Sequence, residues 1–118
     1  MKNSFLALVL LFVNFSCAQN TSKHITEFSQ NDIKNGILVD VRTPEEFKKG
    51  HLENSINIDW FATDFAKKFE GIEKDKIIYV YCKKGGRSAK AQNKLISLGF
   101  QNVVDLEGGY DAWLASEN

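Results

Sequence analysis

Four short apolar runs alternate with stretches of helical character, and this alternation limits the chain to few folds. The runs lie at residues 37–41, 56–58, 77–81 and 103–106. Two of them are rich in β-branched residues and almost continuously apolar, as strands are when both faces of a parallel sheet are covered. Because helical segments separate the runs, we expect one α/β domain with a mainly parallel sheet and right-handed crossovers.

The first helical segment has clear signals at both ends. Thr43 and Glu46 have the spacing of a capping box, and Pro44 lies at the first helical position. Gly50 is placed to end the helix. The sequence therefore predicts a short helix directly after the first of the four strands.

Two further helical segments are predicted from their apolar periodicity. In residues 60–69, three phenylalanines recur at four-residue spacing, which predicts one buried stripe made of Phe61, Phe65 and Phe69. In residues 88–98, three apolar residues share one face, and Gly99 follows as a stop. The members of this second face are Ala91, Leu95 and Leu98.

Residues 1–18 differ from the rest of the chain and have the pattern of a secretory signal peptide. Lys2 provides a basic start, and residues 5–13 form an unbroken run of nine apolar residues. A bilayer span needs about 20 residues, so the run fits the apolar region of a signal peptide instead. We expect an exported, periplasmic protein in which residues 19–24 form a short polar tether and residues 25–118 form the domain.

The cleavage site has two interpretations. Small residues at Ser16 and Ala18 suit a general signal peptidase, which would leave Gln19 as the first residue. Alternatively, residues 14–17 resemble a bacterial lipobox, in which Cys17 becomes the lipidated first residue, although Asn14 stands where leucine is usual. The lipoprotein interpretation is favoured because it gives a reason for a cysteine at this point. Contact with a membrane is expected only through this lipid anchor.

Charge and cysteine content argue against a nucleic-acid role, an internal disulfide and a bound metal. Fifteen basic and fifteen acidic side chains cancel, so there is no overall field to attract nucleic acid. Once Cys17 is removed or acylated, Cys82 is the only thiol and an internal disulfide is excluded. The sequence has no cluster of histidine and cysteine ligands, and we expect neither a metal nor an organic cofactor.

The residues after the third apolar run include a candidate nucleophile and a candidate anion-binding loop. Cys82 leaves this strand at its carboxyl end, where open α/β sheets bind ligands. The two glycines that follow allow a tight turn whose N–H groups converge on one point, next to the start of a helix. Cationic side chains in this loop favour the thiolate, the nucleophilic form of cysteine. The residues expected to bind an anion are Lys83, Lys84, Gly85, Gly86 and Arg87. A buried structural cysteine followed by an ordinary turn is also compatible with these residues alone.

Three blocks of the sequence resemble the motifs of rhodanese domains, and together they extend over nearly all of residues 25–118. The first is Asp-Val-Arg-Thr-Pro-Glu-Glu-Phe at 40–47, which continues through 50–52 and 56–58. The second is the loop at 81–88, and the third is Leu-Glu-Gly-Gly-Tyr-Asp-Ala-Trp at 106–113. The resemblance implies a five-stranded parallel sheet with helices on both faces.

The resemblance also implies roles for individual residues. Cys82 would carry a persulfide, with residues 83–87 as the backbone cradle for the sulfur anion. Asp40 and Arg42 would support this loop from the neighbouring strand, and Glu46 would hold Arg42. We interpret His51 as structural, because a resting thiolate has no proton to lose.

The sequence departs from the family pattern at one place. Residues 52–55 read Leu-Glu-Asn-Ser, where the family usually has Ile-Pro-Gly-Ala. This connection lies away from the expected chemistry, so the departure concerns its local shape and not the activity.

The implied activity is that of a thiosulfate sulfurtransferase. A small anionic sulfur donor such as thiosulfate would transfer sulfur to Cys82, and cyanide or a thiol would then accept it, in a covalent two-step reaction. Two alternatives remain: a non-catalytic rhodanese-like binding module, and a cysteine-loop phosphatase or arsenate reductase. Members of the last class have five residues between cysteine and arginine, whereas Cys82 and Arg87 are separated by four.

Overall fold

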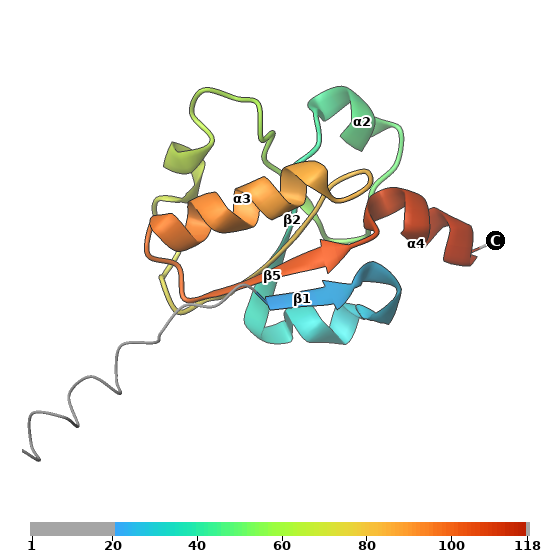
Figure 1. The fold of residues 1–118 in the computed structure, drawn as a ribbon, viewed down its shortest axis with the longest axis horizontal. Helices are drawn as coiled ribbons and strands as arrows, with labels where there is room; N and C mark the ends of the chain where they lie inside the picture. Colours follow the sequence, from blue (N-terminus) through green and yellow to red (C-terminus); the bar gives the residue numbers. More distant parts are fainter. Residues whose placement is uncertain (1–20, 118) are drawn as a thin grey trace, which may run out of the picture.

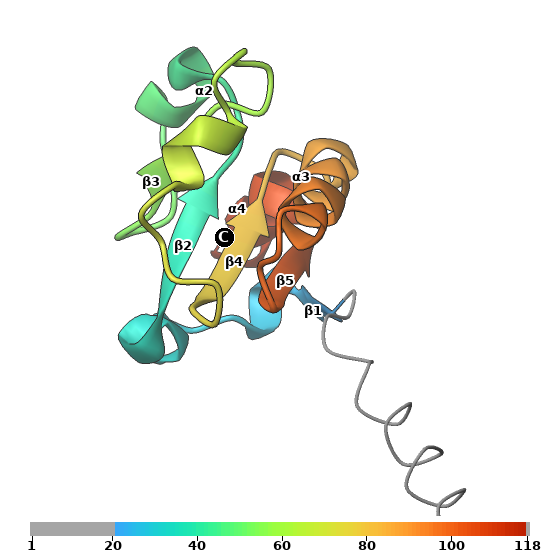
Figure 2. The ribbon, with the colours of Figure 1, turned by 90° about the vertical axis from the view of Figure 1, so that its left-hand side faces the viewer.

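Five parallel strands form the sheet in the order β1-β5-β4-β2-β3 (Figures 1 and 2). The computed structural model describes residues 21–117, and the predicted signal peptide and the lipidation candidate Cys17 lie outside them. The strands are β1 Thr21–His24, β2 Gly36–Asp40, β3 Ile56–Asn57, β4 Ile77–Tyr81 and β5 Asn102–Glu107. The prediction of an α/β fold with a five-stranded parallel sheet is confirmed.

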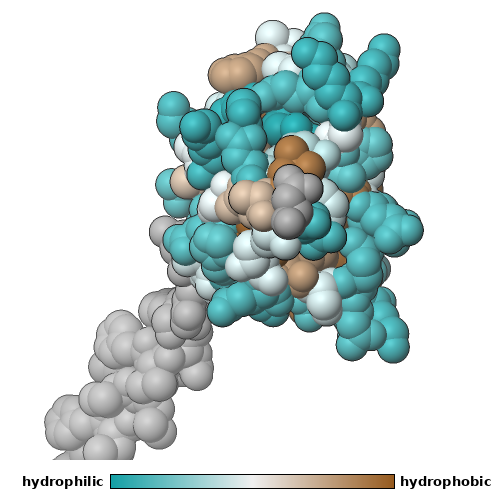
Figure 3. Space-filling view, turned by 90° about the vertical axis from the view of Figure 1, so that its right-hand side faces the viewer, coloured by the Kyte–Doolittle hydropathy of each residue, from teal (hydrophilic) through white to brown (hydrophobic). Residues whose placement is uncertain are grey.

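Helices cover both faces of this sheet (Figures 1 and 2). On one face, α3 (Gly86–Ser97) and the 3-10 helix η4 (Ala66–Phe69) enclose an apolar cluster that contains Val80, Leu95 and Phe100. On the other face, Ile25 and Leu106 belong to a second cluster, against which Trp113 packs. The elements that supply this side are η2 (Ile25–Glu27), η3 (Gln30–Asn35) and α4 (Gly109–Glu117). Figure 3 views the end that carries α4, where hydrophilic side chains surround a small apolar area.

The predicted tether is wrong for Thr21–His24, because these residues form β1. The strand pairs in parallel with β5, from Thr21 opposite Val104 to His24 opposite Glu107. Gln92 of α3 adds a hydrogen bond from its Nε2 to the Thr21 carbonyl at 2.7 Å. An edge strand is held by main-chain hydrogen bonds on one side and can remain polar, so it lacks the apolar signal by which strands are recognised.

The predicted phenylalanine stripe is only partly correct. Phe65 and Phe69 are buried, but Phe61 is 66% exposed. The main chain explains the difference, because Trp60 N still bonds to the Val41 carbonyl, and the next amide, that of Phe61, bonds to Asp59 Oδ1. A regular helix therefore does not form over residues 60–65, and helical structure is confined to η4.

The predicted capping box is confirmed in α2 (Pro44–Lys48). Thr43 Oγ1 accepts the Glu46 amide at 3.3 Å, and Glu46 Oε1 accepts the Thr43 amide at 3.0 Å. Pro44 occupies the first helical position. Gly50 follows with φ 149°, in the region that favours glycine, and turns the chain away from the helix. These contacts fix Glu46 at the carboxyl end of the sheet.

Residues 52–55, where the sequence departs from the family pattern, contain a turn. Asn54, which stands where the family usually has glycine, adopts φ 67°. Asparagine tolerates the left-handed region better than other non-glycine residues, so it can occupy this turn without glycine. Tyr81 Oη accepts the Leu52 amide at 3.0 Å and contacts Ser55 Oγ at 3.1 Å, which ties the connection to β4.

In the part of the chain from 21 to 117, none of the helices is both long and apolar enough to span a bilayer.

Candidate active site

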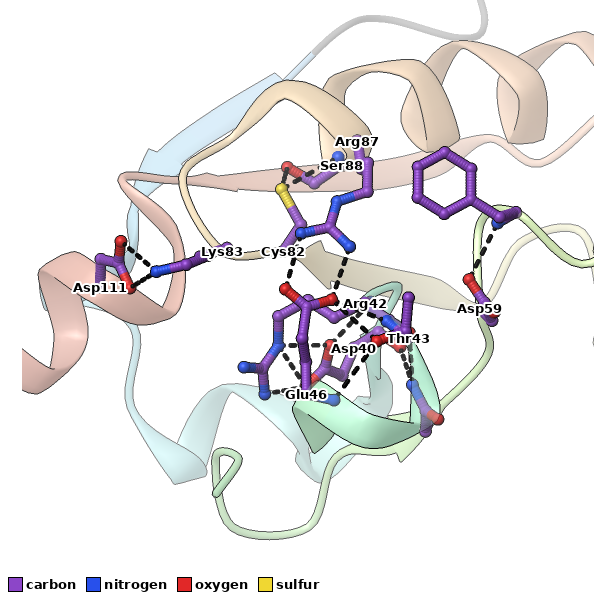
Figure 4. Close-up of polar contacts among 12 residues, drawn as sticks. Asp40, Arg42, Thr43, Glu46, Asp59, Cys82, Lys83, Arg87, Ser88 and Asp111 are labelled. Atoms are coloured by element: carbon purple, nitrogen blue, oxygen red, sulfur yellow. Dashed lines mark hydrogen bonds and ion pairs between the residues drawn. The ribbon is translucent and has the colours of Figure 1, made fainter. Parts of the chain in front are cut away.

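The Cys82 side chain is cradled by the loop between β4 and α3. Its Sγ accepts the Gly85 amide at 3.1 Å and the Ser88 amide at 3.4 Å, and it lies 3.6 Å from Ser88 Oγ (Figure 4). The residue is only 1% exposed, yet it lines a pocket of about 300 Å³. Two backbone donors that converge on one buried sulfur can stabilise negative charge there.

Local backbone conformation explains this convergence. Gly85 adopts φ 132°, which brings its N–H back toward the sulfur three residues earlier. Helix α3 begins at Gly86, so the Ser88 amide belongs to the first turn and has no partner within the helix. The positive end of the helix dipole therefore faces Cys82.

The loop is also held from the opposite side by the start of α4. Tyr110 N donates to the Cys82 carbonyl at 2.8 Å, and Asp111 N donates to the Lys83 carbonyl at 3.1 Å. Gly109 has φ 68°, and a Cβ at this position would collide with the Lys83 carbonyl oxygen. Close backbone packing thus requires the second glycine of the third motif, Gly109, a role that the sequence pattern alone does not reveal.

Asp40 and Arg42 form a buried ion pair beside the loop. Arg42 Nη2 lies 2.6 Å from Asp40 Oδ2, and Arg42 Nε donates to the same carboxylate. The second bond of Nη2 goes to the Gly50 carbonyl at 2.8 Å. The guanidinium also lies 4.3 Å from the ring centre of Tyr110, whose amide holds Cys82. Arg42, paired with Asp40, therefore contacts the first turn of α4, whose amides bond to the loop that carries Cys82.

Glu46 does not hold Arg42 as predicted, because it pairs with Arg87. Arg87 Nη1 and Nη2 donate to the two Glu46 oxygens at 2.7 and 3.0 Å (Figure 4). This hydrogen bonding, helped by the Thr43 amide and opposed by burial, lowers the pKa of Glu46 to about 2. Asp40 and the Gly50 carbonyl already engage Arg42. The ion pair ties α2 to the first turn of α3.

The cationic side chains that line the pocket differ in how closely they pair with acidic groups. Lys83 Nζ is 2.8 Å from Asp111 Oδ1, whereas the Lys84 side chain is 79% exposed and its Nζ lies 3.9 Å from the other oxygen of this carboxylate. Lys90 of α3 also lines the pocket, three residues after Arg87. Sequence reasoning missed Lys90, although a spacing of three along a helix indicates a shared face.

Two other features lie apart from the sulfur. His51 stacks on Phe47 with ring centres 3.6 Å apart, and its Nδ1 lies 2.8 Å from the Phe47 carbonyl. It lines a different depression, together with Trp113.

A larger cavity of about 700 Å³ is lined by residues between Thr63 and Phe100, and it does not include Cys82. Among residues 21–117, no three His, Cys, Asp or Glu side chains group closely enough to hold a metal ion.

The family model described as "Rhodanese-like domain" matches residues 24–116, nearly the whole of the described chain. The chain belongs to the rhodanese-like domain family. The loop just described lies within the matched residues, and Cys82 stands there at the position that the resemblance assigns to the sulfur carrier.

Several curated relatives of this rhodanese-like chain are named as sulfurtransferases. Thiosulfate sulfurtransferase 16, chloroplastic, of Arabidopsis thaliana is 42% identical over 86 residues, covering 64% of the chain and 71% of that protein. The adenylyltransferase and sulfurtransferase UBA4 of Candida albicans is 40% identical over 106 residues, and the chain spans only 21% of its length. The family and these names support a role in sulfur transfer in general.

Solved structures show the same fold. A rhodanese-like domain protein from Staphylococcus aureus has a TM-score of 0.69 at 30% identity, with 79% of this chain and 90% of that chain covered. The human single-domain sulfurtransferase TSTD1 has a TM-score of 0.62 at 24% identity, with 71% and 85% covered. At this lower identity the likeness to TSTD1 concerns the fold alone.

Proposed function

We propose that this rhodanese-like protein is a thiosulfate sulfurtransferase that carries sulfane sulfur as a persulfide on Cys82. One observation carries the proposal: the amides of Gly85 and Ser88 converge on the Cys82 sulfur at the floor of a cation-lined pocket. Such a floor suits a group that bears negative charge before, during and after the reaction.

In the first step, the Cys82 thiolate attacks the outer sulfur of thiosulfate. A new S–S bond forms while the S–S bond of thiosulfate breaks, and sulfite leaves with the electron pair. The product is a Cys82 persulfide whose terminal sulfur is anionic. No external oxidant is needed, because the transferred sulfur is already at the sulfane level.

In the second step, a nucleophilic acceptor attacks the terminal sulfur. Cyanide gives thiocyanate, and a thiolate gives a new persulfide. In both cases the electron pair of the broken S–S bond returns to Cys82, which becomes a thiolate again. This is covalent catalysis with ping-pong character. By analogy with oxyanion holes, each backbone donor to the developing anion would be worth about 2.7–4 kcal/mol.

The engagement of Arg87 argues against phosphatase chemistry. An arginine binds a tetrahedral oxyanion through a pair of N–H groups directed to it. Here Arg87 Nη1 and Nη2 donate to Glu46 instead, at 2.7 and 3.0 Å, and only four residues separate Arg87 from Cys82.

The presence of Cys82 itself favours catalysis over a purely binding role.

Steady-state thiosulfate:cyanide transfer tests the proposal with a matched pair of variants. Cys82→Ser should abolish thiocyanate formation, because a hydroxyl cannot form the persulfide. Cys17→Ser removes the other cysteine of the chain and should leave transfer unchanged. Normal turnover by Cys82→Ser would refute the proposal.

A further inference from the structure

The segment that follows β4 concentrates basic charge on a chain whose overall charge is zero. Residues 82–104 contain five basic side chains and no acidic one, so the rest of the chain has ten basic and fifteen acidic side chains. The five are Lys83, Lys84, Arg87, Lys90 and Lys94. Such a one-sided distribution attracts anions to one face of a protein even when its net charge is zero.

Three of these cations form a stripe along the outer side of α3. Arg87, Lys90 and Lys94 follow one another at intervals of three and four residues, which places them on one side of the helix. The helix packs on the core through other residues, among them Ala91 and Leu95. Lys90 and Lys94 are exposed, and neither takes part in an ion pair within residues 21–117. Both can therefore bind the acidic groups of a partner.

An exposed aromatic ring adjoins this stripe. Phe61 is largely in solvent, and the hydrogen bond from its amide to Asp59 Oδ1 fixes the turn on which it stands. The Arg87 guanidinium lies 5.8 Å from the centre of the Phe61 ring. Aromatic and arginine side chains are enriched where proteins bind one another. Because Arg87 and Lys90 also line the pocket of Cys82, an apolar and a cationic surface meet beside the sulfur.

The dimensions of this surface exceed those of a small sulfur donor. Arg87 and Lys94 are seven residues apart, which is about 10 Å along the helix axis. Of the stripe, Arg87 and Lys90 line the pocket of Cys82 and Lys94 does not. Thiosulfate and cyanide also have no apolar part that could cover Phe61. The surface therefore fits a longer anion that carries an apolar group.

We propose that this acceptor surface, made of Phe61, Arg87, Lys90 and Lys94, docks an acidic polypeptide that presents a cysteine as the sulfur acceptor. Carboxylates of the polypeptide pair with the stripe, and an apolar side chain covers Phe61. A nucleic acid would match the charge and the ring, but it has no thiol to accept sulfur.

The transfer itself follows the second step of the proposed function, on which this inference rests. The thiolate of the docked cysteine attacks the terminal sulfur of the Cys82 persulfide, and a new S–S bond forms on the acceptor. The S–S bond to Cys82 breaks, and its electron pair returns to Cys82 as the thiolate. The acceptor cysteine leaves as a persulfide, so no oxidant or reductant is consumed.

Fluorescence anisotropy with a labelled peptide tests the docking without sulfur chemistry. The probe is Glu-Glu-Leu-Ser-Glu-Glu, and the matched peptide has glutamine in place of each glutamate. The acidic peptide should bind the wild type with a Kd at least about fivefold lower, and high salt should remove the difference.

Three variants locate the binding on the acceptor surface. Lys94→Glu should raise the Kd of the acidic peptide about three- to tenfold, because it replaces an attraction by a repulsion. Phe61→Ser should raise this Kd at least about fivefold. Lys34→Glu makes the same charge change at an exposed residue of η3, on the other face of the sheet, and should leave the Kd unchanged.

Discharge of the persulfide links the docking to sulfur transfer. After Cys82 is loaded with thiosulfate and the excess donor is removed, the same peptides with cysteine in place of serine serve as acceptors. Intact mass should show the acidic peptide removing the sulfur at least about fivefold faster than the neutral peptide, with rates compared per thiolate because glutamates raise the pKa of a nearby thiol. Lys94→Glu should lose this preference but keep normal thiosulfate:cyanide turnover, since Lys94 does not line the pocket.

Three results would overturn the inference. Equal binding or equal discharge by the acidic and neutral peptides would show that the surface does not select an anionic acceptor. Equal effects of Lys34→Glu and Lys94→Glu would show attraction by overall charge alone. Tighter binding of a single-stranded oligodeoxythymidine of equal charge would identify a nucleic-acid surface instead. Failure to load Cys82 from thiosulfate would count against the proposed function, and anisotropy would still decide whether the acidic peptide docks.

Discussion

The Glu46–Arg87 ion pair allows a quantitative test of how α2 is joined to the first turn of α3, next to the loop that carries Cys82. Replacing Glu46 by glutamine removes the charge but keeps an oxygen that can complete the capping box with Thr43. The Glu46 pKa of about 2, against an ordinary value of 4.5, sets an upper limit of about 3 kcal/mol on the linked stabilisation. Because the Glu46 and Arg87 side chains remain 28% and 21% exposed, solvent screening reduces the expected loss to about 1–2 kcal/mol.

The pH dependence follows from the lowered pKa of Glu46. A carboxyl group whose pKa falls on folding stabilises the protein above its ordinary pKa, and the contribution disappears as the pH falls toward the folded value. Urea unfolding should therefore show a large difference between wild type and Glu46→Gln at pH 7, and little difference near pH 2. Glu45→Gln, at an exposed neighbouring position, serves as the control and should change little. An equal loss at both pH values would refute the electrostatic account of this contact.

Three other predictions concern the ion pair at the loop, the pocket cations and the N-terminal segment. Arg42→Leu leaves the Asp40 charge buried without its partner, so urea unfolding should show a loss of about 3–5 kcal/mol, and a loss below 1 kcal/mol would contradict the pairing. Lys84→Ala should raise the KM for thiosulfate and weaken its dependence on salt more than Lys83→Ala does, because Asp111 engages Lys83 more closely. Cys17→Ala should abolish incorporation of labelled palmitate if Cys17 is the lipid anchor, whereas a soluble form that begins at Gln19 would contradict lipidation.

Local signals were sufficient for much of the fold. The apolar strands, the capping box at Thr43 and the glycine turn after Cys82 depend on residues close together in the sequence, and each appears in the structure as predicted. β1 was missed because a polar edge strand is defined by its pairing with β5, which is distant in the sequence. Phe61 was misplaced because main-chain bonds around Trp60 interrupt the helix that the spacing predicts.

The site was harder to predict, because its members meet only through tertiary packing. Two arginines, Arg42 and Arg87, were candidate partners for Glu46. The sequence could not indicate that Asp40 pairs with Arg42 and leaves Arg87 to pair with Glu46. The close approach of Gly109 to the Lys83 carbonyl depends on how β4 and β5 align, because α4 follows β5 directly. No local pattern contains that alignment.

The central claim is that Cys82 carries the transferred sulfur, and intact-mass spectrometry of the protein after incubation with thiosulfate tests it most directly. The wild type should gain the mass of one sulfur atom and lose it when cyanide is added, while Cys82→Ser should gain nothing. A wild-type protein that forms thiocyanate without ever gaining sulfur, or a Cys82→Ser variant that gains it, would contradict the account.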